Sequence, residues 1–384
     1  MNRHSNKNNS RRVGGRRAGR GWFCSAAGDG ENKHASLRHR SLVSPRSSRR
    51  NNALLALLLI SSSMLANYRY VKDASRYLDA HANNVKKLSH LPHKPARTAA
   101  ICAVQKWGLP YIDEWVDYHL AIGFETIFIY DNSDDFETQG WYSNRFQNGT
   151  DRVEIFHWPG VAQQMPAYDE CIRHIKHSSD QDHFWISFID LDEFVVIKDT
   201  EKFPFITDFL ETVPQDAGGF TMNWQVFGWN NQTKYEAKPL SLRFNLFRKN
   251  KHVKTIARTD RVSSMPNPHF AQYNDTEKIY KSVDTDGETV EGPFNNRMPT
   301  DVLAINHYYA KSLEEYTARC ERGRADLNVS KSLLKGKDTY HPCLPEEVIL
   351  AEWRSHSNEH FEFDDNVWKL LKERVPSYTK YENR

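Results

Sequence analysis

The sequence has few cysteines, and their spacing excludes the usual cysteine-based sites. Five occur among 384 residues, and none of them forms a Cys-x-x-Cys pair. Structural zinc sites and redox dithiols depend on such pairs, so the sequence supports neither. Four cysteines follow the N-terminal region: Cys102, Cys171, Cys320 and Cys343. Two alternatives stay open for them, disulfides in an oxidising compartment or buried free thiols.

The sequence also lacks an apolar run of full membrane-spanning length. The longest run, residues 53–66, has about 14 residues, whereas a bilayer-spanning helix needs roughly 20. Arg49 and Arg50 directly precede it, and Tyr68 and Tyr70 follow it. Basic residues before an apolar run favour a cytoplasmic N-terminus, and tyrosines suit the membrane interface. We expect a short, uncleaved signal anchor; a cleaved signal peptide and an organelle transit peptide are the alternatives.

Acidic residues are scarce in the first 52 residues, which carry thirteen Lys and Arg against two Asp and Glu, a net charge of +11. This region is rich in Arg, Asn, Ser and Gly, so it cannot bury enough apolar surface to fold, and we expect a disordered arm. The rest of the chain carries 39 basic and 47 acidic residues, a net charge of −8. A mildly acidic body does not favour a nucleic-acid-binding face, and we expect no nucleic-acid partner.

Beyond the apolar run, residues 67–97 are polar and indicate a stem linker. We expect one domain over residues 98–330 and a C-terminal helical extension, residues 331–384, packed on it. Four N-glycosylation sequons all follow the apolar run, as a lumenal body requires; their asparagines are Asn148, Asn231, Asn274 and Asn328.

Strand and helix patterns alternate through the first half of the predicted domain. Apolar strand patterns cover residues 99–104, 126–130, 153–156 and 184–191, and helical patterns cover residues 111–122 and 162–175. Such alternation predicts an α/β fold with a mostly parallel sheet flanked by helices. After about residue 215 the pattern becomes strand-rich, so we expect a strand-rich second half.

The most informative motif is a cluster of three acids, Asp190, Asp192 and Glu193, at the end of the apolar strand 184–191. In an open α/β sheet, ligands bind outside the carboxyl ends of the strands, where these acids fall. Clustered carboxylates repel one another, and a divalent cation such as Mg²⁺ or Mn²⁺ stabilises them together. Such an ion can also bridge a diphosphate. The alternative is an acidic turn without a metal.

Three other residues could complete such a site. Asp131 ends the second strand, where a carboxylate can hold a nucleoside, although it can equally form a local Asx turn. His307 could complete a metal shell beside carboxylates, and His269 is a competing histidine.

A series of short motifs extends across residues 99–325. In chain order it comprises Cys102-Ala103-Val104-Gln105-Lys106, Pro110-Tyr111, Glu114-Trp115, Tyr118-His119, Phe128-Ile129-Tyr130-Asp131-Asn132-Ser133, Ala167-Tyr168 with Cys171, Trp185 to Phe194, Trp224 with Phe227-Gly228, Lys254, and His307-Tyr308 to Lys311-Ser312. Taken together, the series resembles the family 92 glycosyltransferases and their bacterial relatives of family 2 type. The resemblance implies a GT-A fold, a UDP-sugar donor, Mn²⁺ and inversion at the anomeric carbon, often in galactosyl transfer.

Carried over by position, the resemblance implies that Asp190 and Asp192 form the motif for metal and donor phosphate. Asp192 would be the direct ligand, and His307 the third protein ligand. Asp131 would approach the uridine.

The resemblance also implies that Lys106 faces the donor and that Lys254 lies near the diphosphate; a surface salt bridge is the alternative for both. Such families read Lys-Asn-Glu after the first strand, whereas Lys106 is followed here by Trp107-Gly108. An inverting transfer needs a general base, for which Glu193 and Asp260 are the candidates.

These features lead us to expect a metal-dependent glycosyltransferase that moves a sugar, galactose from a UDP-sugar, to a glycan acceptor. We expect a single-pass type II protein of the Golgi membrane with a lumenal catalytic domain. Two alternatives stay open. One is a non-catalytic lumenal protein that keeps the fold and binds a glycan or a partner. The other is a phosphohydrolase with Asp190 as nucleophile, which the mid-chain position of the motif disfavours.

Overall fold

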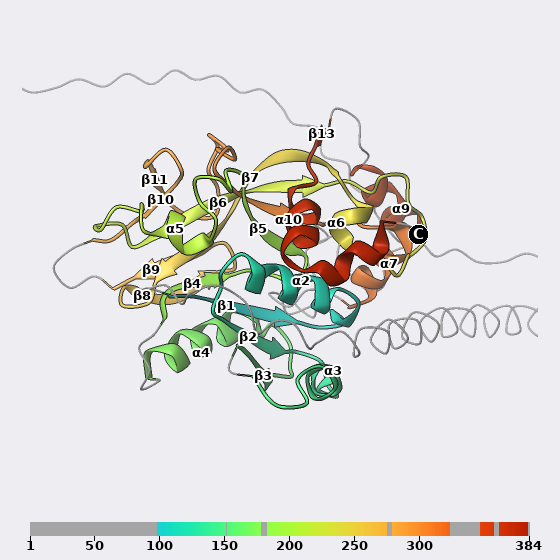
Figure 1. Cartoon of the computed structure of the whole chain (residues 1–384), viewed down its shortest axis with the longest axis horizontal. Coiled ribbons are helices and arrows are strands. Elements are labelled where there is room, and N and C mark those ends of the chain that lie inside the picture. Colours follow the sequence, from blue (N-terminus) through green and yellow to red (C-terminus); the bar gives the residue numbers. More distant parts are fainter. Residues whose placement is uncertain are drawn as a thin grey trace, which may run out of the picture. The chain divides into compact units, whose positions relative to one another are not determined.

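The computed structural model of the chain describes residues 98–150, 152–177, 183–274, 279–322, 346–356 and 361–382 (Figure 1). The expected basic arm, apolar segment and stem linker lie outside these residues, as do Cys343 and Asn328. None of the helices in the described ranges has the length and apolar character needed to cross a membrane.

The first half alternates strands and helices, as the sequence predicts. The elements are β1 (Thr98–Gln105), α2 (Leu109–Ala121), β2 (Thr126–Asp131), α3 (Glu137–Arg145), β3 (Val153–His157), α4 (Gln164–His177) and β4 (His183–Phe188). The four strands lie in the order β4-β1-β2-β3, and all three pairings are parallel. The predicted parallel α/β arrangement is confirmed for this half.

The second half is rich in strands. Its elements are β5 (Glu193–Ile197), α5 (Ile206–Leu210), β6 (Gly219–Phe227), α6 (Leu240–Arg243), β7 (Leu246–Arg258), β8 (Val262–Asn267), β9 (Phe270–Tyr273), β10 (Ser282–Val283), β11 (Thr289–Val290), β12 (Leu303–His307), α7 (Leu313–Arg322), α9 (Glu346–Arg354), β13 (Glu362–Phe363), α10 (Asn366–Arg374) and the 3₁₀ helix η2 (Pro376–Tyr381). All described strands except β8 and β9 join one mixed sheet, which curls strongly and is flanked by helices (Figure 1).

Apolar side chains cover both faces of the parallel strands. Along β1, Ala99, Ile101 and Ala103 face one apolar cluster, whereas Ala100 and Cys102 face the other, because successive side chains of a strand point to opposite faces. Helices α2 and α4 lie on opposite sides of β1 (Figure 1). Burial on both faces explains why the parallel strands read as continuous apolar runs.

The structure decides between a disulfide and a free thiol for three of the four cysteines. Cys102 of β1 and Cys171 of α4 form a disulfide, with their Cα atoms 6.4 Å apart. Cys320 is a buried free thiol.

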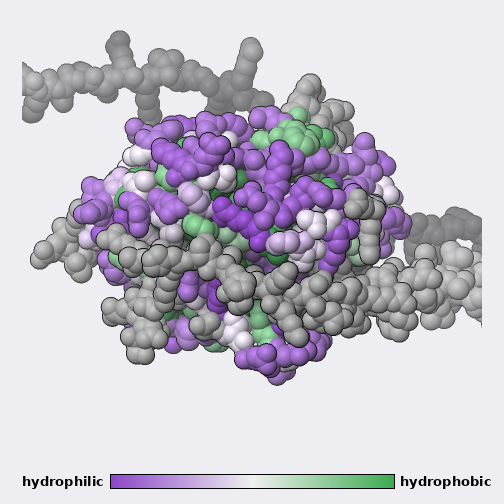
Figure 2. All heavy atoms as spheres, in the orientation of Figure 1, coloured by the Kyte–Doolittle hydropathy of each residue, from purple (hydrophilic) through white to green (hydrophobic). Residues whose placement is uncertain are grey.

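The C-terminal segments pack on the main body. Trp368 and Leu371 of α10 belong to the same apolar cluster as Trp115 of α2. Trp353 of α9 packs on Trp229, with ring centroids 4.2 Å apart. The domain boundaries stay a prediction. On the face shown in Figure 2, the described residues are mainly hydrophilic and apolar residues form only small patches.

Two connections bring distant segments to the end of β4. The chain turns after β4 and returns as β5, which pairs antiparallel with β12 so that Glu193 lies opposite His307. Strand β12 also pairs parallel with β6, which places His307 beside Val226. The acid turn therefore lies next to residues more than a hundred positions later in the chain.

Candidate active site

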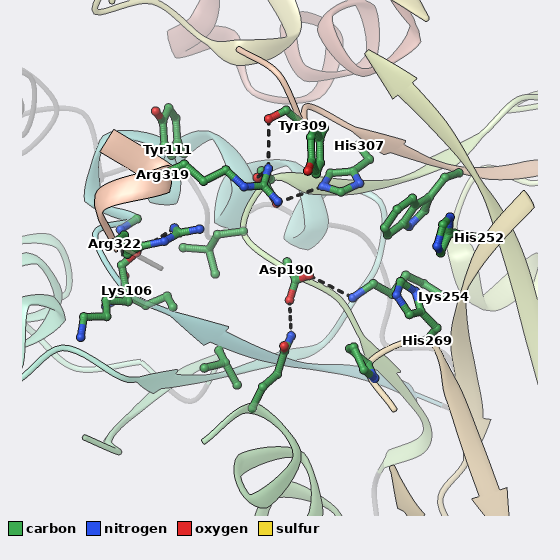
Figure 3. A pocket seen from close by; sticks show the side chains of 18 of the residues that line it. Lys106, Tyr111, Asp190, His252, Lys254, His269, His307, Tyr309, Arg319 and Arg322 are labelled. Carbon is green, nitrogen blue, oxygen red and sulfur yellow. Dashed lines mark hydrogen bonds and ion pairs between the residues drawn. The ribbon is translucent and has the colours of Figure 1, made fainter. Parts of the chain in front are cut away.

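A cavity of about 490 Å³ opens beside the turn that follows β4 (Figure 3). It is lined by the end of β1, by the acid turn, by β6, β7 and β12, and by α7. The described lining residues include the carboxylates of Asp190 and Asp192 and six cationic side chains, those of Lys106, Arg248, Lys254, Lys311, Arg319 and Arg322. An excess of positive charge in a concave site attracts anionic ligands such as phosphates.

Asp190 is held between three neighbours. Its Oδ1 accepts hydrogen bonds from Gln164 Nε2 at 2.7 Å and from the Tyr168 hydroxyl at 3.3 Å, and its Oδ2 accepts one from Lys254 Nζ at 3.1 Å. Burial opposes ionisation, but the Lys254 ammonium outweighs it and the pKa of Asp190 lies below its ordinary value. Asp190 is therefore an ionised carboxylate in a fixed orientation, with about a third of its side chain exposed.

Asp192 faces a second group of donors. Its Oδ2 lies 2.7 Å from Lys311 Nζ and 3.7 Å from Arg319 Nη1, and its Oδ1 lies 3.6 Å from His307 Nε2. Burial opposes ionisation of Asp192 too, yet Lys311 and His307 hold its pKa well below the ordinary value. The two aspartates are thus kept ionised by different partners on opposite sides of the turn.

Glu193, a predicted general base, lies beneath this turn and does not line the cavity. Its side chain is fully buried, and its Oε2 accepts a hydrogen bond from the Asp190 backbone N–H at 3.0 Å and pairs with Lys254 Nζ at 3.1 Å. Burial, only partly offset by Lys254, raises the pKa of Glu193 to about 8. In this position Glu193 supports the turn from inside the fold.

The other base candidate, Asp260, also lies outside the cavity lining. Its side chain is 58% exposed and pairs with Arg261 at 3.7 Å in the turn after β7. The structure therefore brings neither candidate base to the cavity.

Asp131, expected near a uridine, is fully buried with both oxygens occupied. Oδ1 accepts from the N–H and hydroxyl of Ser133, and Oδ2 accepts from the N–H and hydroxyl of Thr138. This is the local Asx-type turn that the sequence left open. Its neighbour Asn132 lines the cavity instead, with its amide fixed by the backbone carbonyls of Trp158 and Gly160.

Among the described residues, no group of three or more His, Cys, Asp and Glu side chains is arranged to hold a metal ion. Asp192 and His307 nevertheless suit one. Their facing atoms are 3.6 Å apart, and burial lowers the pKa of His307, which keeps the imidazole in its metal-binding neutral form. Its buried Nδ1 has no hydrogen-bond partner within the described chain. Asp192 and His307 therefore fit a divalent ion that takes its other ligands from phosphate and water.

Two arginines of α7 that the sequence analysis does not name also belong to the site. Arg319 and Arg322 of α7 line the cavity three positions apart on one helix face (Figure 3). The Arg319 guanidinium lies over the Tyr309 ring at 3.9 Å, and Arg322 Nη1 donates to the Lys106 carbonyl at 3.0 Å. The sequence signal was the Arg-x-x-Arg spacing on a helix that follows His307.

The opposite wall of the cavity is aromatic. Trp224 stacks on His252 at 4.8 Å and meets His269 edge-on at 5.1 Å and His307 edge-on at 4.3 Å. The buried Trp224 Nε1 makes no hydrogen bond within the described residues. Aromatic rings on a cavity wall are suited to hydroxyl-bearing ligands such as sugars.

An α/β sheet with an ionised acid turn, an excess of cations and an aromatic wall at its strand ends is typical of proteins with a ligand site for phosphorylated, hydroxyl-rich molecules. A sequence model of glycosyltransferase family 92 matches residues 101–291, and the chain belongs to this family. The expected family is confirmed.

Two curated relatives have detectable similarity. A glycosyltransferase family 92 protein of Oryza sativa subsp. japonica is 28% identical over 102 residues, 27% of this chain and 17% of the relative. One of Arabidopsis thaliana is 30% identical over 97 residues, 24% of this chain and 16% of the relative. The matches thus span about a sixth of these relatives.

Proposed function

We propose that this protein is a metal-dependent, inverting glycosyltransferase with a GT-A fold that transfers galactose from UDP-galactose to a glycan acceptor. The observation that carries the proposal is the acid turn, where Asp190 and Asp192 enter one cavity beside His307 and an excess of cations. The family supports sugar transfer, and the net charge of the cavity lining suits a nucleotide diphosphate.

In the proposed reaction, Asp192 and His307 hold Mn²⁺ or Mg²⁺, which supplies positive charge for the departing diphosphate. Lys311 and Arg319 lie at Asp192 and offer further charge to the phosphates. Lys254 and Gln164 keep Asp190 in its orientation, as a residue that positions the donor.

The segment Trp107-Gly108 replaces the family's Asn-Glu beside the donor half of the cavity. A side chain at Gly108 would meet Leu191 Cδ2 at 2.8 Å, so the backbone approaches the acid turn closely. The Gly108 N–H donates to Gln105 Oε1 at 3.0 Å. We infer that the loop shapes the donor site with its backbone where relatives use a carboxylate.

We also propose a type II anchor in the Golgi membrane with the described residues in the lumen. The disulfide between Cys102 and Cys171 suits an oxidising compartment. The sequon residues Asn148, Asn231 and Asn274 are exposed, as lumenal glycosylation requires.

The test is turnover of UDP-galactose by the purified full-length protein with Mn²⁺, measured as released UDP. Asp192→Asn removes a proposed ligand and is expected to abolish turnover, whereas Asp301→Asn, at a carboxylate with a 91% exposed side chain, should leave it unchanged. Full activity of Asp192→Asn would refute the assignment. Absence of calorimetric binding of UDP with Mn²⁺ at millimolar concentration would favour the non-catalytic alternative.

A further inference from the structure

The cavity lacks an available carboxylate to act as a base. Among the described lining residues the only carboxylates are Asp190 and Asp192, and both form ion pairs with lysines. An inverting transfer needs a group that takes the proton of the acceptor hydroxyl. The base must therefore be another cavity-lining group that carries a free lone pair.

His269 is such a group, and the fold fixes its orientation. It lies at the tip of the β8–β9 hairpin, where its backbone N–H donates to Asn267 Oδ1 at 3.0 Å and its carbonyl accepts from Thr255 Oγ1 at 2.9 Å. Its ring Nδ1 lies 3.0 Å from the carbonyl oxygen of Val253. These contacts hold both the backbone and the ring of His269 at the cavity wall (Figure 3).

This geometry also fixes the tautomer. A carbonyl oxygen can only accept, so Nδ1 carries the proton and Nε2 carries the lone pair. No hydrogen bond within the described chain occupies Nε2. His269 thus presents an unprotonated nitrogen beside the cavity, and its opposite nitrogen is anchored to a backbone carbonyl.

Burial keeps His269 neutral, and nearby cations add to this effect. Burial is the main cause that lowers its pKa, to about 3, and Lys254 and His252 add to the shift, while Asp190 opposes it. An aspartate base has an ordinary pKa of about 3.9, so this imidazole is of comparable basicity. A diphosphate bound near Lys254 would add negative charge and raise the pKa of His269 back towards its ordinary value.

We propose that His269 is the general base of the transfer, an inference that rests on the proposed function. As the acceptor oxygen forms a bond to the anomeric carbon, its proton passes to His269 Nε2. The bond from that carbon to the phosphate oxygen breaks, and its electron pair leaves with the nucleoside diphosphate. The imidazolium then returns its proton to solvent.

His252, another histidine of this aromatic wall, has different contacts. Its ring stacks on Trp224 at 24° and meets Phe294 edge-on at 4.7 Å, and its Nδ1 pairs with Asn250 Oδ1 at 2.7 Å. Nδ1 of His252 is therefore held by a side chain of its own strand, whereas Nδ1 of His269 is held by the backbone carbonyl of Val253, the residue before Lys254. His269 is thus anchored next to the lysine that pairs with Asp190 of the acid turn.

The experiment compares His269→Ala and His269→Gln with the wild-type full-length protein. Transfer from UDP-galactose to a panel of 4-nitrophenyl monosaccharides is measured as kcat and KM, and binding of UDP with Mn²⁺ is measured by calorimetry. Loss of a general base should lower kcat by about 10² to 10⁴-fold and leave UDP affinity unchanged. Free imidazole should restore part of the His269→Ala rate. His177→Ala, at an exposed histidine of α4, is the matched control.

The results test the assignment of His269 as the base separately from the proposed glycosyltransferase function. A wild-type rate of transfer in His269→Gln would overturn the base assignment while the glycosyltransferase function stands. Weakened binding of UDP with Mn²⁺ in parallel with kcat would also overturn it, because His269 would then be a metal or donor ligand. If the wild-type protein neither binds UDP nor releases it from UDP-galactose, both proposals fall. Unfolding midpoints of both variants equal to the wild type show that a lost rate is chemical.

Discussion

Replacing Lys254 by methionine tests the ion pairs that support the acid turn. The Lys254 side chain is fully buried, with its Nζ 3.1 Å from both Asp190 Oδ2 and Glu193 Oε2. At this distance and an effective dielectric constant of about 20, each contact with an ionised carboxylate is worth about 5 kcal/mol before desolvation is counted. The pKa of Asp190 is lowered, so Asp190 is ionised at neutral pH, whereas Glu193 ionises near its pKa of about 8. Desolvation of the ammonium offsets much of this energy, but removing only the lysine leaves the Asp190 carboxylate, and at higher pH also the buried Glu193 carboxylate, without its cation. We expect Lys254→Met to lower the free energy of unfolding by about 3–5 kcal/mol.

The pH dependence distinguishes this cause from a packing defect. Burial already raises the pKa of Glu193 to about 8, and loss of Lys254 raises it further. A carboxyl whose folded pKa exceeds its unfolded value contributes stability below about pH 4.5 that is lost as the pH rises through the folded pKa. Relative to the wild type, Lys254→Met should therefore be more destabilised at about pH 9, where the wild-type Glu193 is ionised and paired with Lys254, than at about pH 5, where Glu193 is neutral in both proteins.

The assay is urea denaturation at both pH values, with Lys254→Met/Glu193→Gln as the matched variant. Glutamine cannot ionise, so the double variant should recover the additional loss seen at the higher pH, and the difference between the two pH values should disappear. An equal loss at both pH values, unaffected by Glu193→Gln, would refute the reasoning.

Two further predictions concern buried charge outside the cavity. Arg145 pairs with both Asp113 and Asp117, and all three side chains are at least nine-tenths buried, so Arg145→Met should cost about 3–5 kcal/mol in urea denaturation. Arg173→Met, at a largely exposed arginine, should cost less than about 1 kcal/mol, and equal losses would contradict the argument. Burial lowers the pKa of His119 to about 3, so its neutral form contributes stability that is lost as the pH falls from about 6.5 towards 3, by up to about 1.4 kcal/mol per pH unit. His119→Gln cannot titrate, and its unfolding midpoint should vary less with pH over this range; an unchanged slope would disprove the role of His119.

The local sequence pattern was sufficient to predict most helices and strands of the parallel half. Apolar runs and helical spacing predicted the four strands and two of the three helices of the parallel half within about three residues of their observed ends, because burial on both faces gives these segments a regular apolar pattern. Helix α3 was not predicted. The rule that ligands lie at strand ends also led to Asp190 and Asp192, and both line the cavity.

The same rule did not predict that the side chains of Asp131 and Glu193 lie outside the cavity lining. Asp131 also ends a strand, but Ser133 and Thr138 satisfy its oxygens locally. Glu193 adjoins Asp192, yet it begins β5, where its side chain faces Lys254 inside the fold. Neighbouring acids thus have opposite surroundings, which composition alone cannot distinguish.

The sequence by itself determined the family, the parallel half of the sheet and the acid turn, since each is encoded in contiguous residues. Only the tertiary structure decided what surrounds that turn. His307 and Lys311 reach Asp192 because β12 pairs with β5, and His269 reaches the cavity because a hairpin after β7 presents it there. Contacts between residues so far apart depend on strand pairing across the whole sheet, and no local period in the chain records them.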